Sequence, residues 1–268
     1  MPLICVCSPK GGVGKTTLAA NLTYALARAG SKVLAIDFDV QNALRLHFGV
    51  PLSDERGYVG KSSESFDWSQ HVLGAGSNMF VLPYGEVTEQ QRVEFEDKLT
   101  NDEHFLARGL GTLLNYPGLI IVADFPPGPS AALKAMTPLA DIHLVTLLAD
   151  TASMSLLPHV ENNRLTGEAL NHKHGHFFVV NQSDSRRQIS RDVTAFMEER
   201  LGEQLIGIIH RDESVIEANA SQKSIFEFSP ASAAAFDIEI IAKKVAAKLG
   251  IKVGDGTVHN MPRMSAGL

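Results

Sequence analysis

The sequence predicts an α/β fold in which a mostly parallel, twisted sheet carries helices on both faces. Continuous apolar runs, as expected of strands buried on both faces, alternate along the chain with stretches of helical periodicity. Residues 3–37 alone contain a strand, a glycine-rich loop, a helix and a second strand, which is a βαβ unit. With 268 residues, the chain fits one large domain built from such units.

Each predicted strand has a local reason. Residues 3–7 are all apolar and precede the glycine-rich loop, and residues 32–36 form a second apolar run that ends at Asp37. Five further short apolar runs lie between helical or loop segments, as expected for buried parallel strands. These runs cover residues 80–82, 119–123, 143–148, 177–180 and 205–209.

The predicted helices follow from apolar residues at helical spacing. Residues 15–29 repeat leucine and alanine in this way, and Gly30 is placed to end the helix. Other helical stretches cover 88–115, with a weak point at Gly109 and Gly111, as well as 190–201 and 233–249. We expect one domain over residues 1–250. Within it, the Gly- and Ser-rich residues 50–79 are predicted to form a surface insertion, and 251–268 a flexible C-terminal tail.

Composition excludes several classes of protein. The hydrophobic content of 44% argues against a disordered chain, and a net charge of −6 argues against non-specific nucleic-acid binding. We find neither an apolar run long enough to span a membrane nor a secretory signal. Cys5 and Cys7 are predicted to be buried thiols without a disulfide, as is typical of a reducing compartment.

The strongest motif is a glycine-rich loop between the first predicted strand and the first helix. Glycines let the backbone approach phosphate groups, and successive N–H groups at a helix N-terminus bind the anion. Within this pattern, Lys15 would reach the β- and γ-phosphates and Thr16 would bind Mg²⁺. The predicted nucleotide-binding loop consists of Lys10, Gly11, Gly12, Val13, Gly14, Lys15, Thr16 and Thr17.

This loop resembles the phosphate loop of the MinD/ParA-type deviant Walker-A ATPases. The strict motif has glycine where this chain has Pro9, and Lys10 follows it, giving the variant K-G-G-V-G-K-T. The resemblance extends to about residue 249 and implies ATP and Mg²⁺ as ligands. It also implies a dimer in which Lys10 crosses to the partner's nucleotide. A second cation there would offset charge that develops in the transition state.

Three aspartates lie where predicted strands end. The carboxyl ends of strands line the ligand crevice of an α/β sheet, so Asp37, Asp39 and Asp124 are expected to face the phosphates. Asp37 and Asp124 are predicted to hold Mg²⁺ through water. By resemblance, Asp39 orients the attacking water and, with Lys10 and Lys15, completes the catalytic set. The Pro-Pro-Gly turn after Asp124 resembles the second switch of the family.

The resemblance also assigns residues to the nucleoside. Asn181, after the predicted strand 177–180, would read the adenine edge, since an amide can pair with its donor and acceptor. Asp150, after another strand, would reach the partner's ribose. The base-side loop would contain His210, Arg211 and Asp212, with His210 at a position where the family usually has proline.

Three further features of the sequence bear on metal binding or on partner contacts. His172, His174 and His176 alternate, yet no nearby carboxylate or thiol completes a metal site, so a solvated loop is the preferred interpretation. An iron–sulfur role is rejected, because both cysteines precede the phosphate loop. Trp68 in the 50–79 segment is interpreted either as a local anchor or as a partner contact.

Within the larger family, several stretches resemble the BcsQ (YhjQ-type) cellulose-biosynthesis ATPases. These stretches are residues 42–48, 67–68, 82–85 and 209–213. The resemblance implies a slow dimeric ATPase of the cytoplasm, recruited to the inner membrane or cell pole, that supports assembly or localisation of cellulose synthase. The implied partners are a second copy, BcsR and BcsE, with no specific nucleic acid. Two alternatives stay open, a DNA-partition or cell-division positioning ATPase and a nucleotide-binding scaffold with negligible turnover.

Overall fold

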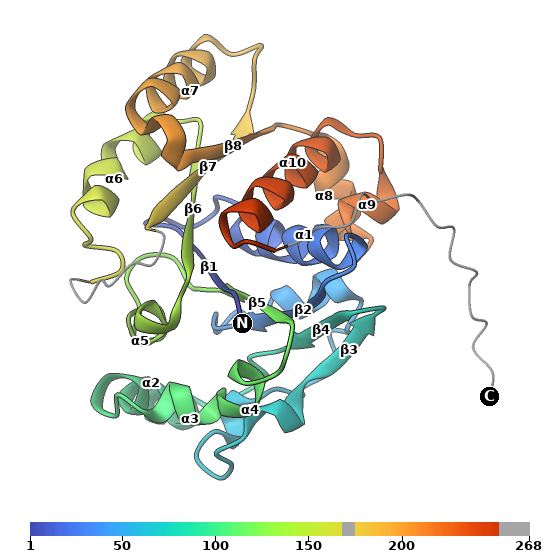
Figure 1. The fold of residues 1–268 in the computed structure, drawn as a ribbon, viewed down its shortest axis with the longest axis vertical. Coiled ribbons are helices and arrows are strands. Elements are labelled where there is room, and N and C mark those ends of the chain that lie inside the picture. Colours follow the sequence, from blue (N-terminus) through green and yellow to red (C-terminus); the bar gives the residue numbers. More distant parts are fainter. Residues whose placement is uncertain (168–174, 252–268) are drawn as a thin grey trace, which may run out of the picture.

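In the computed structural model, which describes residues 1–167 and 175–251, helices cover both faces of an eight-stranded sheet (Figure 1). The strand order is β3-β4-β2-β5-β1-β6-β7-β8, and only the β3/β4 pair at one edge is antiparallel. The predicted α/β fold class is therefore confirmed. The strands are β1 (Leu3–Cys7), β2 (Lys32–Asp37), β3 (Leu73–Gly76), β4 (Met79–Leu82), β5 (Leu119–Asp124), β6 (Ile142–Leu148), β7 (His176–Ser183) and β8 (Leu205–His210).

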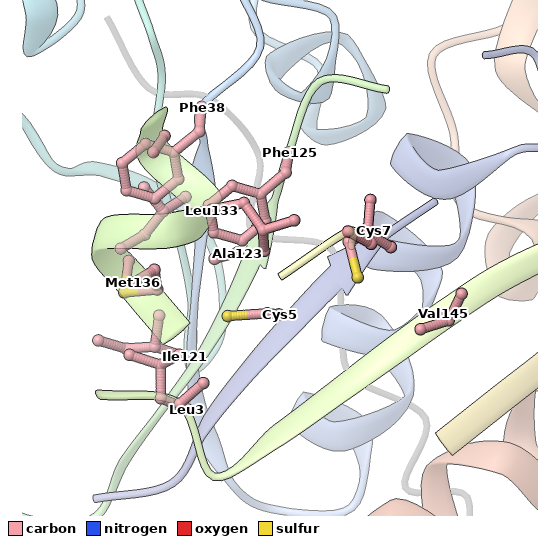
Figure 2. Packing of buried hydrophobic residues seen from close by; sticks show 14 of the residues in the cluster. Leu3, Cys5, Cys7, Phe38, Ile121, Ala123, Phe125, Leu133, Met136 and Val145 are labelled. Atoms are coloured by element: carbon pink, nitrogen blue, oxygen red, sulfur yellow. The ribbon is translucent and has the colours of Figure 1, made fainter. Parts of the chain in front are cut away.

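The side chains of the central strand β1 alternate between the two hydrophobic cores, one on each face of the sheet. Leu3, Cys5 and Cys7 belong to the core on one face, whereas Ile4 and Val6 belong to the core on the other. Figure 2 shows Leu3 and Cys5 in the first of these cores. Both thiols are free and fully buried, as predicted, and burial raises the pKa of Cys7 to about 12. They therefore act as small apolar groups in this fold.

The helices divide between the two faces. Side chains of α1, α8, α9 and α10 contribute to one core, and those of α2, α3, α4, α5, α6 and α7 to the other. In Figure 1, α1, α8, α9 and α10 lie together on one side of the sheet. The helices are α1 (Lys15–Arg28), α2 (Glu89–Asn101), α3 (Phe105–Gly109), α4 (Gly111–Leu114), α5 (Ala131–Met136), α6 (Thr151–Glu161), α7 (Gln188–Leu201), α8 (Glu213–Ala220), α9 (Ile225–Phe228) and α10 (Ala233–Lys248).

The stretch 88–115 is less continuous than the sequence pattern indicates. It forms three helices, because α2 stops at Asp102, whose backbone is extended, before α3 begins. The expected weak point between Gly109 and Gly111 separates α3 from α4. Thr88 starts α2 with a reciprocal capping box to Gln91.

The segment 50–79, predicted to be a surface insertion, sends two aromatic side chains into the core. Tyr58 and Trp68 are buried, and Trp68 packs against Tyr58, Phe95 and Phe105 with ring centroids 4.7–5.9 Å apart. Of the two interpretations of Trp68, the structure supports the local anchor. The same segment also provides β3 at the sheet edge.

Gly109 is needed beneath this tryptophan. A Cβ at position 109 would lie 2.2 Å from Trp68 Cε2, whereas a Cβ at Gly111 would meet nothing within 4 Å. We expect Gly109→Ala to lower the free energy of unfolding by about 1–3 kcal/mol, the usual effect of overpacking. Gly111→Ala is the matched control, with a change below about 1 kcal/mol. Chemical denaturation measures both, and equal effects would contradict the close packing.

Two earlier expectations fall partly outside the described residues. His172, His174 and the predicted tail beyond Ile251 lie there. His176, by contrast, is buried at the start of β7, where its Nε2 lies 3.2 Å from Thr166 Oγ1, so the solvated-loop interpretation is wrong for this residue. Among the described residues, no helix is both long and apolar enough to cross a membrane.

Candidate nucleotide-binding site

The glycine-rich loop joins β1 to α1 at the carboxyl edge of the sheet. Gly12 and Gly14 have φ values of +73° and +86°, a left-handed backbone that glycine adopts without strain. Gly14 is also the N-cap of α1, so the first turn of this helix opens directly onto the loop. Lys15 is buried in that turn, with 7% of its surface exposed. The structure thus supplies the strand–loop–helix context that an anion-binding loop requires.

Asn181 holds this loop from β7. Its Nδ2 donates a hydrogen bond to the Val13 carbonyl at 2.8 Å, and its Oδ1 accepts one from the Gln182 N–H at 2.9 Å. An amide has one further hydrogen and one further lone pair, so adenine reading by Asn181 stays a prediction. In the structure, Asn181 fixes the glycine-rich loop through its hydrogen bond to Val13.

A substitution at Gly14 tests the close contact between the glycine-rich loop and Asn181. An added Cβ would lie 2.4 Å from Asn181 Nδ2, on a backbone that alanine adopts only with strain. We expect Gly14→Ala to lower the free energy of unfolding without nucleotide by about 1–3 kcal/mol. Gly11→Ala, whose Cβ would touch Pro127 at an ordinary 3.7 Å, should have a smaller effect. Thermal denaturation compares the two variants, and a Gly14→Ala protein as stable as Gly11→Ala would contradict the assignment.

Two fully buried carboxyl groups lie beside the loop. The residues Asp37 and Asp124 are partners in the register of β2 and β5. Asp37 Oδ1 accepts from the Asp39 N–H at 2.9 Å, and Oδ2 accepts from the Leu44 N–H at 3.0 Å. Burial raises the pKa of Asp37 well above its usual range, and the charge of Asp124 adds to the shift.

Asp124 has no hydrogen-bond partner at either carboxyl oxygen among the described residues. Burial raises its pKa to about 7, while the nearby Thr16 hydroxyl, which does not reach hydrogen-bond geometry, and Lys15 lower it. Buried acceptors without donors are costly unless a cation or a water occupies the site. Thr16, Asp37 and Asp124 therefore fit a Mg²⁺ ion held largely through water.

The described residues alone do not form a complete metal cage. Within residues 1–167 and 175–251, no group of three or more His, Cys, Asp or Glu side chains is placed to hold a metal ion. This agrees with Mg²⁺ chemistry, in which one or two carboxylates are supplemented by water and by phosphate oxygens of the substrate.

Aromatic stacking fixes the two acidic turns relative to each other. Phe38 and Phe125 are buried and stacked, with ring centroids 5.0 Å apart and planes only 1° from parallel (Figure 2). Phe38 N–H also donates to the Asp124 carbonyl. Asp39 follows Phe38, is half-buried, and accepts from the Gln41 N–H at 3.0 Å. The turn after Asp124 reaches the phosphate loop, since Gly128 N–H donates to the Ser8 carbonyl.

The structure joins two predicted residues that the sequence assigned to different contacts. Lys10 Nζ lies 2.7 Å from Asp150 Oδ2, and their side chains are 22% and 41% exposed. Asp150 also caps α6 by accepting from the Ser153 N–H at 2.7 Å. Burial acts to raise the pKa of Asp150, but Lys10 and Ser153 outweigh it and lower the value. In a single subunit, Lys10 is thus held by an internal ion pair.

The predicted base-side residues lie at the end of β8 and directly after it, and each makes a polar contact. His210 N–H and Nδ1 both pair with Asp237 Oδ2 at 2.9 Å, and Arg211 Nε donates to Glu213. Asp212 caps α8 through the Ser214 N–H and also accepts from the Ala234 N–H. Burial acts to raise its pKa, but these N–H groups outweigh it and lower the value. Asp237 was missed in the sequence, because nothing local links it to His210.

The chain is similar in sequence to proteins of one described family. The family profile described as "Cellulose biosynthesis protein BcsQ" matches residues 1–245. The protein of that description from Salmonella typhimurium is 27% identical over 235 residues, covering 87% of this chain and 89% of its own length.

Two solved structures show the same fold. The septum site-determining protein MinD of Pyrococcus horikoshii, complexed with Mg-ADP, aligns with a TM-score of 0.71 at 20% identity over 93% of this chain and 97% of its own. An ATP complex of a McdA variant from Cyanothece gives 0.72 at 24% identity, over 94% and 97% of the respective chains. The chain therefore shares the overall fold of these two proteins.

Proposed function

The chain belongs to the BcsQ family of cellulose biosynthesis proteins, and from this premise we propose that it is an ATP-dependent dimerising switch. In this proposal it hydrolyses ATP slowly and supports assembly or localisation of the bacterial cellulose synthase complex. One observation carries the nucleotide chemistry. A glycine-rich loop and a buried lysine open the first helix directly beside two buried carboxyl groups, one of which has no hydrogen-bond donor among the described residues.

The proposed binding step uses residues already in place. Backbone N–H groups from Gly11 to Thr17 surround the phosphates, and Lys15 supplies a fixed positive charge at the β- and γ-phosphates. Thr16, with Asp37 and Asp124 acting through water, would hold Mg²⁺, which neutralises phosphate charge when bound. Asn181 and the 210–212 loop are proposed to contact the base.

The proposed hydrolysis step depends on Asp39. It lies two residues beyond Asp37 in a turn that is fixed by the stacked Phe38 and by the Asp39 N–H bond to Asp37. A carboxylate in this turn is suited to accept a hydrogen bond from the attacking water and to orient it toward the γ-phosphate.

The dimer in this proposal depends on Lys10. Its ion pair with Asp150 is partly exposed, so the ammonium group is accessible to a competing anion. The γ-phosphate of an ATP bound by a second copy carries more charge than one carboxylate. We propose that Lys10 exchanges Asp150 for that phosphate when two ATP-bound subunits meet. Asp150, which is then released, is proposed to reach the partner's ribose.

Family membership supports the wider role. We propose a protein of the cytoplasm that reaches the inner membrane or cell pole through partners of the cellulose secretion system, BcsR and BcsE. The net charge of −6 supports the absence of a nucleic-acid ligand. Pull-down of each purified partner by the parent protein, with a salt-dependent DNA-binding assay alongside, tests this part. Tight DNA binding without partner capture would favour a DNA-partition role.

Asp39→Ala tests the switch itself. We expect ATP binding to be preserved, because the loop and Lys15 are untouched, while hydrolysis slows by several powers of ten as the water loses its orientation. The variant should accumulate as a dimer in light scattering with ATP and Mg²⁺. Asp97→Ala, on the exposed surface of α2, is the control that should behave like the parent. Normal turnover by Asp39→Ala would place the catalytic carboxylate elsewhere.

A further inference from the structure

The last turn of α8 contacts the first turn of α1, beside the phosphate loop. Asn219 Nδ2 donates a hydrogen bond to Thr17 Oγ1 at 3.2 Å, although 202 residues separate the two. Thr17 follows the predicted Mg²⁺ ligand Thr16 and is half-buried. Asn219 Oδ1 is buried and has no hydrogen-bond partner among the described residues.

This contact sets the direction of the Thr17 hydroxyl. A hydroxyl has one hydrogen to donate and two lone pairs that accept, and here one lone pair accepts from Asn219. The hydroxyl hydrogen therefore points away from Asn219 and can be donated to another acceptor. In a helix that begins at a phosphate loop, the acceptor within reach of the first turn is a phosphate oxygen.

A second asparagine already attaches this region to α1. Asn21 Nδ2 donates to the Thr17 carbonyl at 2.9 Å, and Asn21 Oδ1 accepts from the Ile225 N–H at 2.9 Å. Asn21 is almost fully buried, with 1% of its surface exposed. The connection between α8 and α9 is thus fixed by Asn21 through backbone groups. Asn219 differs from Asn21 in that it contacts the Thr17 side chain rather than the backbone.

We propose that Asn219 is a positioning residue for the nucleotide, which holds the Thr17 hydroxyl as a donor to the phosphate nearest the nucleoside. Lys15 and Thr16 are assigned to the β- and γ-phosphates and the metal ion, which leaves the α-phosphate to Thr17. The start of α8 follows the proposed base-side loop, so one helix runs from the base contacts to the α-phosphate contact. This inference rests on the nucleotide site proposed above.

Replacement of Asn219 by aspartate reverses the direction of its hydrogen bond with Thr17. In Asn219→Asp the carboxylate accepts the Thr17 hydrogen, which turns the hydroxyl away from the phosphate and places a negative charge nearby. We expect the affinities for ATP and ADP to fall by the same factor, about tenfold to a hundredfold, because the α-phosphate is common to both. Asn219→Ala should lose about threefold to tenfold, since the hydroxyl remains but is no longer oriented. In both variants KM should rise while kcat at saturating ATP stays unchanged.

The controls separate this role from stability. Asn101→Asp adds the same charge at the exposed end of α2 and should bind ATP like the parent. Thr17→Ser keeps the hydroxyl and should bind normally, whereas Thr17→Val should lose affinity. If Asn219 acts through that hydroxyl, adding Asn219→Ala to Thr17→Val causes no further loss.

Titration with a fluorescent ATP analogue and with ADP measures all of these variants, with melting temperatures taken without nucleotide. If Asn219→Asp does not fold, the double-mutant cycle of Asn219→Ala and Thr17→Val tests the inference instead, through the ATP affinities of the two single variants and the double variant. Parent-like affinity of Asn219→Ala and Asn219→Asp, or fully additive losses in that cycle, overturns the inference. A parent protein that binds no nucleotide instead overturns the proposed function.

Discussion

Lys15→Ala is expected to lower the affinity for ATP by at least about a hundredfold, through loss of a charge-assisted contact to the phosphates. The side chain is buried in the first turn of α1, so its charge is fixed and poorly screened by solvent. It also lies close enough to Asp124 to lower the pKa of that carboxyl. Without Lys15, the site presents two buried acids to an anionic ligand.

Titration with a labelled ATP analogue in the presence of Mg²⁺ measures this loss. Lys243→Ala is the matched control, because Lys243 is exposed on α10 and pairs with Glu239 on the same helix. The control should bind ATP like the parent protein. Unchanged affinity in Lys15→Ala would remove the basis for interpreting residues 10–17 as a phosphate loop.

Lys10→Ala is expected to separate binding from turnover. A single subunit should keep much of its ATP affinity, because Lys15 and the backbone of the loop remain. Dimerisation with ATP and Mg²⁺ should be lost, and hydrolysis should fall by about a thousandfold or more, as when a cation supplied across an interface is removed. Light scattering and a phosphate-release assay measure the two effects.

The ion pair within one subunit needs its own control. Asp150→Asn removes the charge that Lys10 contacts, while asparagine keeps the capacity to cap α6. If the role of Lys10 were only to pair with Asp150, both variants would lose dimerisation equally. We expect Asp150→Asn to retain far more hydrolysis than Lys10→Ala.

The central strands, and the strand, glycine-rich loop and helix at the start of the chain, were predictable because their signals are local. Runs such as residues 3–7 and 119–123 are apolar at every position, which is typical of strands buried on both faces. The edge strand β3 was not predicted, since Leu73–Gly76 contains two glycines and only half of its residues are shielded from solvent. The helix α6 was also missed, as it contains Pro158, a residue that usually argues against a helix interior.

Individual residues of the candidate site could be selected from the sequence, but most of the contacts that join them could not. The register of β2 and β5 brings Asp37 opposite Asp124, as expected from the ends of parallel strands. The Phe38–Phe125 stack, the His210–Asp237 pair and the Asn219–Thr17 bond join residues that are far apart in the chain. No pattern in a single sequence reports such pairs, because they depend on how the elements pack.

Mixing Lys10→Ala with Lys15→Ala subunits tests the composite dimer site most directly. Lys10→Ala supplies a working phosphate loop, and Lys15→Ala supplies the lysine that crosses the interface, so a mixed dimer has one complete site. The account predicts that two inactive variants regain ATP hydrolysis on mixing, up to about a quarter of the parent rate for random pairing of subunits. The contradicting result is Lys10→Ala alone dimerising and hydrolysing ATP like the parent, or mixed dimers that form without any recovered hydrolysis.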